Sequence, residues 1–391
     1  MTRDFVFQAD TKVYFGKDHM NKLPEELKRF GKRVLLVYGG GSIKRNGIYD
    51  LVTGLIRENG MVCYELSGVE PNPRHTTVNR GVSICRENHI DVLLAIGGGS
   101  SIDCAKGIAA TALSDSDNVW DLVEHKVPYD RALPVVTILT ISATGSEMDG
   151  GAVISNMDLN VKSSIDSSCI RPKVSFLNPE FTYSVPKYQT ACGSVDIMSH
   201  IFDVGYFNSQ GHMDMLHRVE EEVLSTVIKF APVALNEPDN YEARANLMWA
   251  SSWALNGMLY DGMFQVPVCH AMEHELSAFY DITHGHGLAI LTPRWLSYIL
   301  DEETAPAIRR FGVRCMGCDP LLSDREGAEQ TIKSLEKFFY GTLGLESHLS
   351  NLNIGEENFE AMASHACGDG ALPSIKPLNK DDVVNIYRMC L

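Results

Sequence analysis

The sequence has few basic residues and lacks the long apolar runs that mark membrane proteins. Its 391 residues contain 34 Lys and Arg against 50 Asp and Glu, a formal net charge of −16. Such a surface repels anionic polymers and membranes, so neither nucleic acid nor a membrane is an expected partner. No stretch approaches about 18 uninterrupted apolar residues, and the N-terminal residues contain no apolar signal-peptide core. We therefore expect a soluble, cytoplasmic protein.

Cysteine usage also excludes several classes. Ten Cys are scattered singly, apart from Cys315 and Cys318, and no second CxxC completes a zinc ribbon. Reduced thiols are therefore expected rather than a disulfide framework. The sequence contains no internal repeat and no low-complexity tract, and 45% of its residues are hydrophobic. These features indicate an ordinary globular chain that is long enough for two domains.

The two halves of the sequence differ in their hydrophobic pattern. Short β-branched apolar runs alternate with amphipathic stretches in the first half, whereas the second half is mostly helical in pattern. Near-continuous apolar runs are typical of parallel sheets covered on both faces, so we predict a Rossmann-like α/β domain over residues 1–185 and an all-helical domain over 186–391. The predicted strands are 34–38, 62–66, 91–96 and 134–139, and the predicted helices include 48–59, 76–87, 241–256 and 381–389, the last with Asn379 as its N-cap.

One glycine-rich segment stands between the third predicted strand and a helix that contains Asp103. It consists of Gly97, Gly98, Gly99 and Ser100. Glycines let a phosphate approach the backbone, and the amides at a helix N terminus supply hydrogen-bond donors. The segment is not the G-x-G-x-x-G fingerprint of ordinary Rossmann domains, and a tight turn without a ligand is the alternative interpretation.

A second glycine-rich segment follows the first predicted strand and favours a particular cofactor. It consists of Gly39, Gly40, Gly41 and Ser42. An acidic residue at such a strand end would bind the 2′-hydroxyl of an adenosine ribose and repel a 2′-phosphate. No acidic residue stands here, and the cations Lys44 and Arg45 follow. We therefore predict a preference for NADP(H) over NAD(H).

A third loop follows the fourth predicted strand and is rich in hydroxyl groups. Thr140, Ser142 and Thr144 could hydrogen-bond a pyrophosphate or a ribose while small residues let a nicotinamide lie against the backbone. Alone, this segment would be interpreted as a surface turn.

Four residues in the second half form a pattern typical of a metal site. Asp196 and His200 are four residues apart and share one face of a helix, and His270 and His284 follow in a histidine-rich stretch. One carboxylate and three imidazoles suit a divalent transition metal, Fe²⁺ or Zn²⁺. An isolated Asp/His pair is more often a surface or capping interaction. A metal site is indicated here because both pairs occur in one chain together with the glycine loops.

With both halves considered, the chain resembles the iron-containing (group III) alcohol dehydrogenase family, and within it the NADPH-dependent butanol dehydrogenase and aldehyde reductase branch. The resemblance rests on GGGSSIDCAK at 97–106, TGSE at 144–147, DIMSH at 196–200 and HAMEHELSAFYDITHGHGLAILTP at 270–293. It implies a dehydroquinate synthase-like architecture, with a dinucleotide-binding first domain and a metal-binding second domain. The family's ligands correspond to Asp196, His200, His270 and His284, and its cofactor-binding positions include Asp103 and Lys162.

This resemblance leads to a mechanistic hypothesis. The metal would act as a Lewis acid on the oxygen of a short-chain aliphatic alcohol or aldehyde, such as butanol or butyraldehyde, while hydride passes to or from NADP(H). His274 is the candidate for proton relay, with a packed hydrogen-bonded histidine as the alternative, and His286 has a weaker claim. The apolar stretch 256–266 favours aliphatic substrates. The role of Asp149 is open.

Other functions fit the sequence less well. A metal- and NAD-dependent cyclising lyase of the dehydroquinate synthase type would use a different ligand pattern with a glutamate. A hydrolase that activates water at the metal leaves the glycine loops unexplained, and a non-catalytic metal-binding protein would bind no nucleotide. The resemblance also suggests a homodimer, for which residues 11–15 could supply an edge strand.

Overall fold

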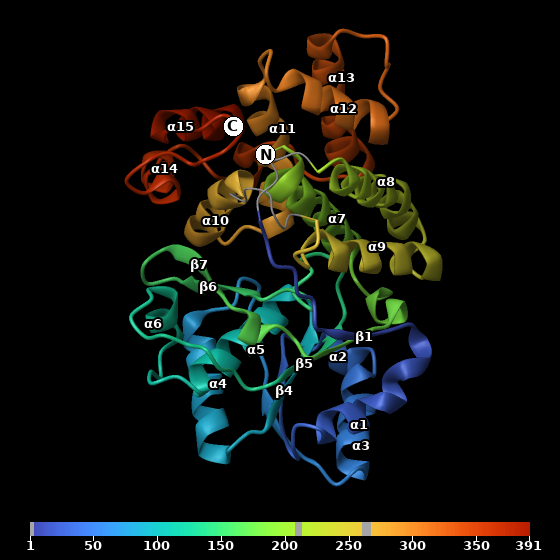
Figure 1. Ribbon diagram of the computed structural model, residues 1–391, viewed down its shortest axis with the longest axis vertical. Helices are drawn as coiled ribbons and strands as arrows, with labels where there is room; N and C mark the ends of the chain where they lie inside the picture. Colours follow the sequence, from blue (N-terminus) through green and yellow to red (C-terminus); the bar gives the residue numbers. More distant parts are fainter. Residues whose placement is uncertain (1–3, 208–212, 260–266) are drawn as a thin grey trace. The chain divides into compact units, whose positions relative to one another are not determined.

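The computed structural model describes residues 4–207, 213–259 and 267–391, which form two compact units. The sheet unit is Ala9–Val185, and the helical unit is Pro186–Leu391 together with the residues up to Gln8. Strands are confined to the blue-to-green part of the chain, and the yellow-to-red part contains helices (Figure 1). None of the helices within the described ranges combines the length and the apolar character that a membrane-spanning segment requires.

A six-stranded parallel sheet forms the centre of the sheet unit. Its strand order is β1-β8-β5-β4-β2-β3, and every neighbouring pair is parallel. The four predicted strands correspond to β2, β3, β4 and β5, so the predicted fold class is confirmed. The strands are β1 (Lys12–Phe15), β2 (Arg33–Tyr38), β3 (Val62–Leu66), β4 (Val92–Gly97), β5 (Val135–Leu139) and β8 (Val174–Leu177).

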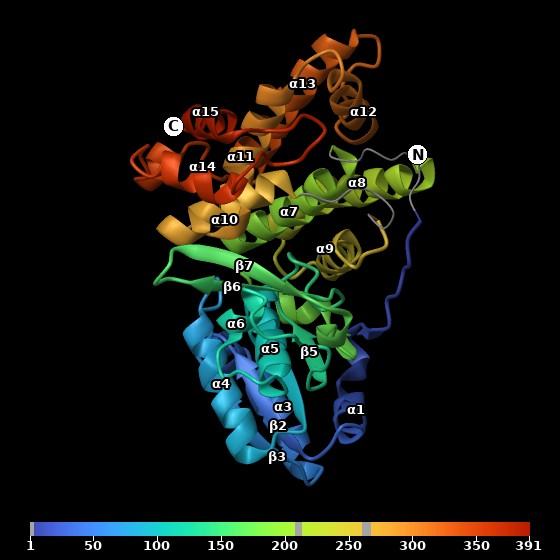
Figure 2. The same ribbon diagram turned by 60° about the vertical axis from the view of Figure 1, so that its left-hand side comes forward.

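Helices cover both faces of this sheet, which explains why its central strands are mostly apolar (Figure 2). Leu36, Leu94 and Ile138 pack with α1 and α3 in one hydrophobic cluster. Leu35 and Leu93, which alternate with these residues along the strands, are also fully buried and point to the other face, where α5 contacts β4. The helices are α1 (Leu23–Lys28), α2 (Ser42–Arg45), α3 (Ile48–Glu58), α4 (His75–Asn88), α5 (Gly99–Ala112) and α6 (Val119–Val123).

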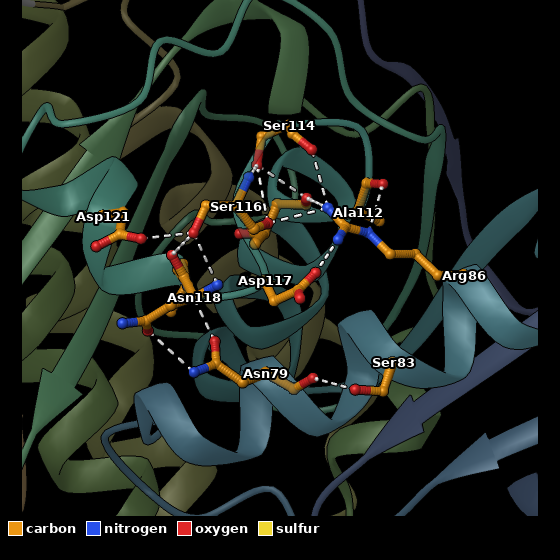
Figure 3. Close-up of polar contacts among 11 residues, drawn as sticks. Asn79, Ser83, Arg86, Ala112, Ser114, Ser116, Asp117, Asn118 and Asp121 are labelled. Carbon is orange, nitrogen blue, oxygen red and sulfur yellow. Dashed lines mark hydrogen bonds and ion pairs between the residues drawn. The ribbon is translucent and has the colours of Figure 1, made fainter.

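Arg86 on α4 anchors the C-terminal end of α5. Its guanidinium donates to the carbonyl oxygens of Thr111 and Ala112, at 3.0 and 3.3 Å, and to those of Ser114 and Ser116, both at 2.9 Å (Figure 3). A cation at a helix C terminus satisfies carbonyls that have no partner within the helix and interacts favourably with the helix dipole. Arg86 thereby fixes one end of α5, whose other end begins at the glycine-rich turn.

An antiparallel hairpin completes the sheet unit and was not predicted. It comprises β6 (Gly151–Asn156) and β7 (Val161–Asp166), with Ser155 opposite Lys162. Strand β8 was also missed, whereas β1 falls within residues 11–15, which were expected to supply an edge strand; each has only four residues. Such short strands carry little periodic signal, because a pattern of alternation needs several residues to be recognised.

The helical unit surrounds a large apolar core. Trp295, Phe311, Phe339 and Tyr387 are among its fully buried side chains. The predicted N-cap of the last helix is confirmed, since the Asn379 side chain accepts hydrogen bonds from two backbone amides. The helices are α7 (Lys187–Ile201), a π-helical turn (Phe202–Tyr206), α8 (Asp214–Asn236), α9 (Tyr241–Ala254), α10 (Val268–Tyr280), α11 (His284–Ile299), α12 (Ala305–Cys315), α13 (Asp324–Glu336), α14 (Phe359–Cys367) and α15 (Lys380–Met389).

Candidate functional site

The three predicted cofactor loops leave the sheet at one edge. Strands β5, β4 and β2 are neighbours and run parallel, so the segments after Leu139, Gly97 and Tyr38 emerge side by side at their carboxyl ends. The chain passes from β2 outward to β3 and then returns to β4 on the other side of β2. Ligands of open α/β sheets bind at such a topological switch point. The region between the 39–42 and 97–100 loops is therefore the candidate nucleotide site.

The glycines after β4 lie in close contact with the loop that follows β5. A Cβ at Gly99 would overlap the Thr144 side chain, and one at Gly98 would lie 3.2 Å from the Ile141 Cβ. The amide of Thr140 donates to the carbonyl of Gly97 at 2.9 Å. The loops 97–100 and 140–144 are thus packed against each other, and Ser100 lies in the first turn of α5, where backbone amides are available to an anion.

The 39–42 loop is open at its second glycine, because no atom lies within 4 Å of a Cβ built at Gly40. The Lys44 ammonium lies 4.5 Å from the centroid of the Tyr49 ring and 5.4 Å from that of Tyr38. Both tyrosine hydroxyls donate to the Glu65 carboxylate, at 2.6 and 2.7 Å. Partial burial raises the pKa of Glu65, but these hydrogen bonds outweigh it and the net shift is downward. Glu65 lies on the neighbouring strand β3 and is not among the predicted cofactor residues.

A buried ion network joins α5 to the 140–151 segment. The fully buried Lys106 ammonium donates to Asp149 Oδ1 at 2.7 Å, Ser146 Oγ at 2.9 Å and the Gly151 carbonyl at 2.8 Å. These three acceptors use all three donors of the ammonium. Asp149 therefore pairs with Lys106 and helps to fix the conformation of the 140–151 segment. This is the structural role of Asp149, which the sequence left open.

Asp103 belongs to the same network. Its carboxylate accepts from Ser146 Oγ at 2.5 Å and from the amide of Val153 at 3.0 Å. Burial and the charge of Asp149 raise the pKa of Asp103 to about 6, although Lys106 opposes the shift. Lys162, the remaining predicted cofactor residue, is a largely buried residue of β7, and Ser142 is partly exposed.

In the helical unit, the four predicted metal ligands come together from three helices. Asp196 and His200 lie on α7, His270 lies on α10, and His284 is the first residue of α11. The Nε2 atoms of His200, His270 and His284 are 3.8, 3.9 and 3.6 Å from Asp196 Oδ1. These separations exceed ordinary hydrogen bonds. Metal–ligand bonds of about 2.0–2.2 Å would place neighbouring donor atoms about 3–3.5 Å apart.

The donor set fits a divalent metal. Within the described ranges, His270 Nε2 is buried and has no hydrogen-bond partner, an orphan of the kind that a bound ion would satisfy. Burial lowers the pKa of His200 well below its ordinary value. Burial also acts to lower the pKa of His270, but the hydrogen bond to Asp203 outweighs it and the net shift is upward. A neutral imidazole keeps a lone pair for a metal. The ring centroids of His200 and His270 are 4.7 Å apart.

Two carboxylates that sequence reasoning missed support these histidines from outside. Asp203 Oδ2 accepts from His270 Nδ1 at 2.8 Å, and Asp203 also accepts from the backbone amides of Cys269 and His270. Glu273 Oε2 bonds to His284 Nδ1. A signal existed for both, since Asp203 and Glu273 each follow a predicted ligand by three residues and so lie close to its helix face. Such carboxylates fix the tautomer and orientation of metal-bound histidines.

His286 and His274, the other two histidines of the 270–286 stretch, differ in burial and in hydrogen bonding. His286 is buried, its Nδ1 is 3.0 Å from the Tyr188 hydroxyl and its Nε2 is 3.0 Å from the Glu346 carbonyl, so it is a hydrogen-bonded packing residue. His274 is partly exposed, and its ring centroid is 5.6 Å from that of His284 and 6.4 Å from that of His270. Within the predicted apolar substrate stretch 256–266, residues 260–266 lie outside the described residues.

Comparisons with known proteins agree on one family. The model for iron-containing alcohol dehydrogenases matches residues 10–179, and the model for the C-terminal domain of the Fe-containing alcohol dehydrogenase family matches residues 190–391. The chain is 49% identical over 386 residues to NADH-dependent butanol dehydrogenase A of Clostridium acetobutylicum, covering 98% of each chain. It is 34% identical to the NADPH-dependent aldehyde reductase YqhD of Escherichia coli, covering 92% of each.

A solved structure shows the same architecture. The crystal structure of NADH-dependent butanol dehydrogenase A from Thermotoga maritima superposes with a TM-score of 0.93 at 36% identity, covering 100% of this chain and 99% of that one. The two family models together match most of the sequence. The chain is also similar over its full length to curated and solved members of the family. The chain belongs to the iron-containing alcohol dehydrogenase family.

Proposed function

We propose that this protein is a metal-dependent oxidoreductase that interconverts alcohols and aldehydes with a nicotinamide cofactor. The observation that carries the proposal is the convergence of three imidazole Nε2 atoms on Asp196 Oδ1. The glycine-rich loops at the sheet's switch point support a dinucleotide partner. Named butanol dehydrogenases and an aldehyde reductase among the relatives support the reaction class.

The metal would be held by Asp196, His200, His270 and His284. Imidazole and carboxylate ligands accept Fe²⁺ or Zn²⁺, and the family name favours iron. When bound, the cation supplies Lewis acidity towards a substrate oxygen, and the nicotinamide supplies or accepts a hydride.

The chain's own residues orient and complete this site. Asp203 accepts a hydrogen bond from Nδ1 of His270, and this orients the ring so that Nε2 of His270 faces Asp196. His274, beside His270 and His284, is proposed to hold or pass on a proton at a ring nitrogen. The amides of the first turn of α5 would bind the cofactor's pyrophosphate.

For the cofactor, we propose a preference for NADP(H). The support is the absence of an acidic side chain at Gly39, together with Ser42 and the cations Lys44 and Arg45. Glu65 partly offsets Lys44. Among the relatives, the butanol dehydrogenases carry NADH in their names and YqhD carries NADPH, so the names support either cofactor.

Steady-state kinetics with both cofactors test this preference. We expect kcat/KM for NADPH to exceed that for NADH by about tenfold or more, because Ser42, Lys44 and Arg45 would bind the 2′-phosphate. Gly39→Asp should reverse the order, because its carboxylate would repel a 2′-phosphate. A Cβ at this position would lie 3.2 Å from the Val69 carbonyl oxygen, so the backbone there must shift slightly to accept it. A tenfold NADH preference in the unchanged protein would contradict the proposal.

We propose short-chain aliphatic alcohols and aldehydes as substrates, and the same assay with a panel of both tests this. Steady consumption of reduced cofactor with butyraldehyde would exclude a cyclising lyase, which releases no net hydride. No observation on the described residues favours that alternative.

We also propose a homodimer formed through the β1 edge of the sheet. Among the described strands, β1 pairs with β8 alone, and a strand edge is a ready template for pairing with a second copy. Light scattering on the purified protein should give about twice the chain mass of 43.2 kDa. A monomer mass at micromolar concentration would contradict this.

A further inference from the structure

The imidazole of His284 lies between two carboxylates. Its Nε2 is 3.6 Å from Asp196 Oδ1, and its Nδ1 bonds to Glu273 Oε2. Because an imidazole carries its two nitrogens on different sides of the ring, the two carboxylates approach it from different directions. Glu273 comes from α10, whereas His284 begins α11.

The surrounding residues hold the Glu273 carboxylate in place. Glu273 is fully buried, and its Oε1 accepts from Ser277 Oγ, one helical turn further along α10, at 2.6 Å. Gly287 on α11 leaves the space that the side chain occupies. A Cβ there would lie 2.8 Å from Glu273 Cγ and 2.9 Å from Oε1. The structure thus contains a fitted recess for this side chain.

We propose that Glu273 is a positioning residue for the metal site, acting through His284. By accepting the Nδ1 proton, it keeps the lone pair of His284 on Nε2, which faces Asp196. The negative charge of Glu273 also makes Nε2 of His284 a stronger electron-pair donor to a metal ion. The inference rests on the metal site proposed above.

Direct ligation by Glu273 is the competing interpretation. One donor atom from each of Glu273, His274 and His284 lies within 4.8 Å of the others, as do those of Asp196, His270 and His284. However, both oxygens of Glu273 are engaged, one by Ser277 and the other by the nitrogen of His284 that does not face Asp196. The positioning role accounts for both contacts.

A second predicted ligand, His270, also has a carboxylate bonded to its Nδ1. Asp203 Oδ2 bonds to His270 Nδ1 at 2.8 Å, as Glu273 bonds to His284. Asp203 also accepts two backbone amides at the start of α10, so its replacement would disturb the helix itself. Glu273 bonds to the side chains of Ser277 and His284, which makes it the cleaner position for a test.

The experiment measures metal affinity rather than turnover. The full-length protein is stripped with a chelator, and its Kd for Co²⁺ and for Zn²⁺ is measured by chelator competition, together with the visible absorption spectrum of the Co²⁺ form. Glu273→Gln is expected to weaken both affinities by about 10–100-fold and to shift the Co²⁺ spectrum. Glu273→Asp keeps the charge but shortens the reach, so it should also weaken binding.

Glu275→Gln is the matched control. Glu275 is a buried glutamate on the same helix, and its carboxylate lies beside His365 at 3.2 Å, away from the four ligands. We expect its metal affinities to stay within about twofold of the unchanged protein. Ser277→Ala, which removes the hydroxyl contact to Glu273, should have an effect between those of the two glutamine variants.

The outcomes separate this inference from the proposed function. Unchanged protein that binds neither ion would overturn the metal site and the inference with it. Tight binding by both the unchanged protein and Glu273→Gln, with the same Co²⁺ spectrum, would overturn the positioning role alone. Equal weakening in Glu273→Gln and Glu275→Gln would also overturn it, because the effect would then be general damage to α10.

Discussion

His270→Ala is expected to abolish metal binding and turnover together. The substitution removes an imidazole whose Nε2 faces Asp196, and it leaves the fully buried Asp203 without its hydrogen-bonded ring. A metal cation stabilises transition-state charge by several kcal/mol, and each 1.36 kcal/mol corresponds to a factor of ten in rate. We therefore expect kcat/KM to fall by about 10³-fold or more, with metal content falling in parallel.

Elemental analysis and steady-state kinetics on the same preparation measure both quantities. His348→Ala is a suitable control, since His348 contacts Ser347 outside α7, α10 and α11. It should keep its metal and its activity. A His270→Ala protein that has lost its metal but turns over at the original rate would refute the proposed mechanism.

Lys106→Met is expected to have the largest effect on the stability of the sheet unit. The ammonium is fully buried, and it lies 2.7 Å from Asp149 Oδ1 while Asp103 lies in the same network. Removing one partner of a buried ion pair leaves an uncompensated charge and costs about 3–5 kcal/mol. For a unit of this size, that loss corresponds to a melting temperature lower by roughly 10 °C. Nucleotide affinity should fall as well, because the network braces the loop that contains Thr144.

Thermal unfolding followed by circular dichroism and a nucleotide titration measure these effects. Adding Asp149→Asn to Lys106→Met removes the stranded carboxylate, so the double variant should be more stable than the sum of the single effects predicts. Lys126→Met, at an exposed pair with Glu124, should leave the melting temperature nearly unchanged. Strict additivity of the two substitutions at 106 and 149 would show that the pair does not act as a unit.

The sheet illustrates how far local pattern predicts structure. The four strands found from hydrophobic pattern have five or six residues; β2, β4 and β5 lie inside the sheet and β3 forms one edge. Strands β1 and β8 are shorter; β1 is stabilised by pairing with β8, and β8 pairs with both β1 and β5. The hairpin of β6 and β7 contains polar residues such as Lys162 and Ser164, and its stability comes from pairing that no local window reveals.

The metal-site residues show the same division. Helical spacing places Asp196 and His200 on one face, and residue type predicts what they could bind. Their approach to His284 depends on the packing of α11 against α7, where a Cβ at Gly285 would overlap the Cys192 carbonyl oxygen. No spacing rule joins positions that are more than eighty residues apart.

The fold class, the glycine loops and the four candidate ligands could be predicted from residue type and short-range spacing alone. This was possible because strand periodicity, helix periodicity and ligand chemistry are local properties of the sequence. Only the tertiary structure decided that Asp149 pairs with buried Lys106, that His286 is a packing residue, and that Glu65, Asp203 and Glu273 adjoin the candidate sites. Each of these roles depends on which side chains face one another across separate elements, and that is set by the packing of the whole unit.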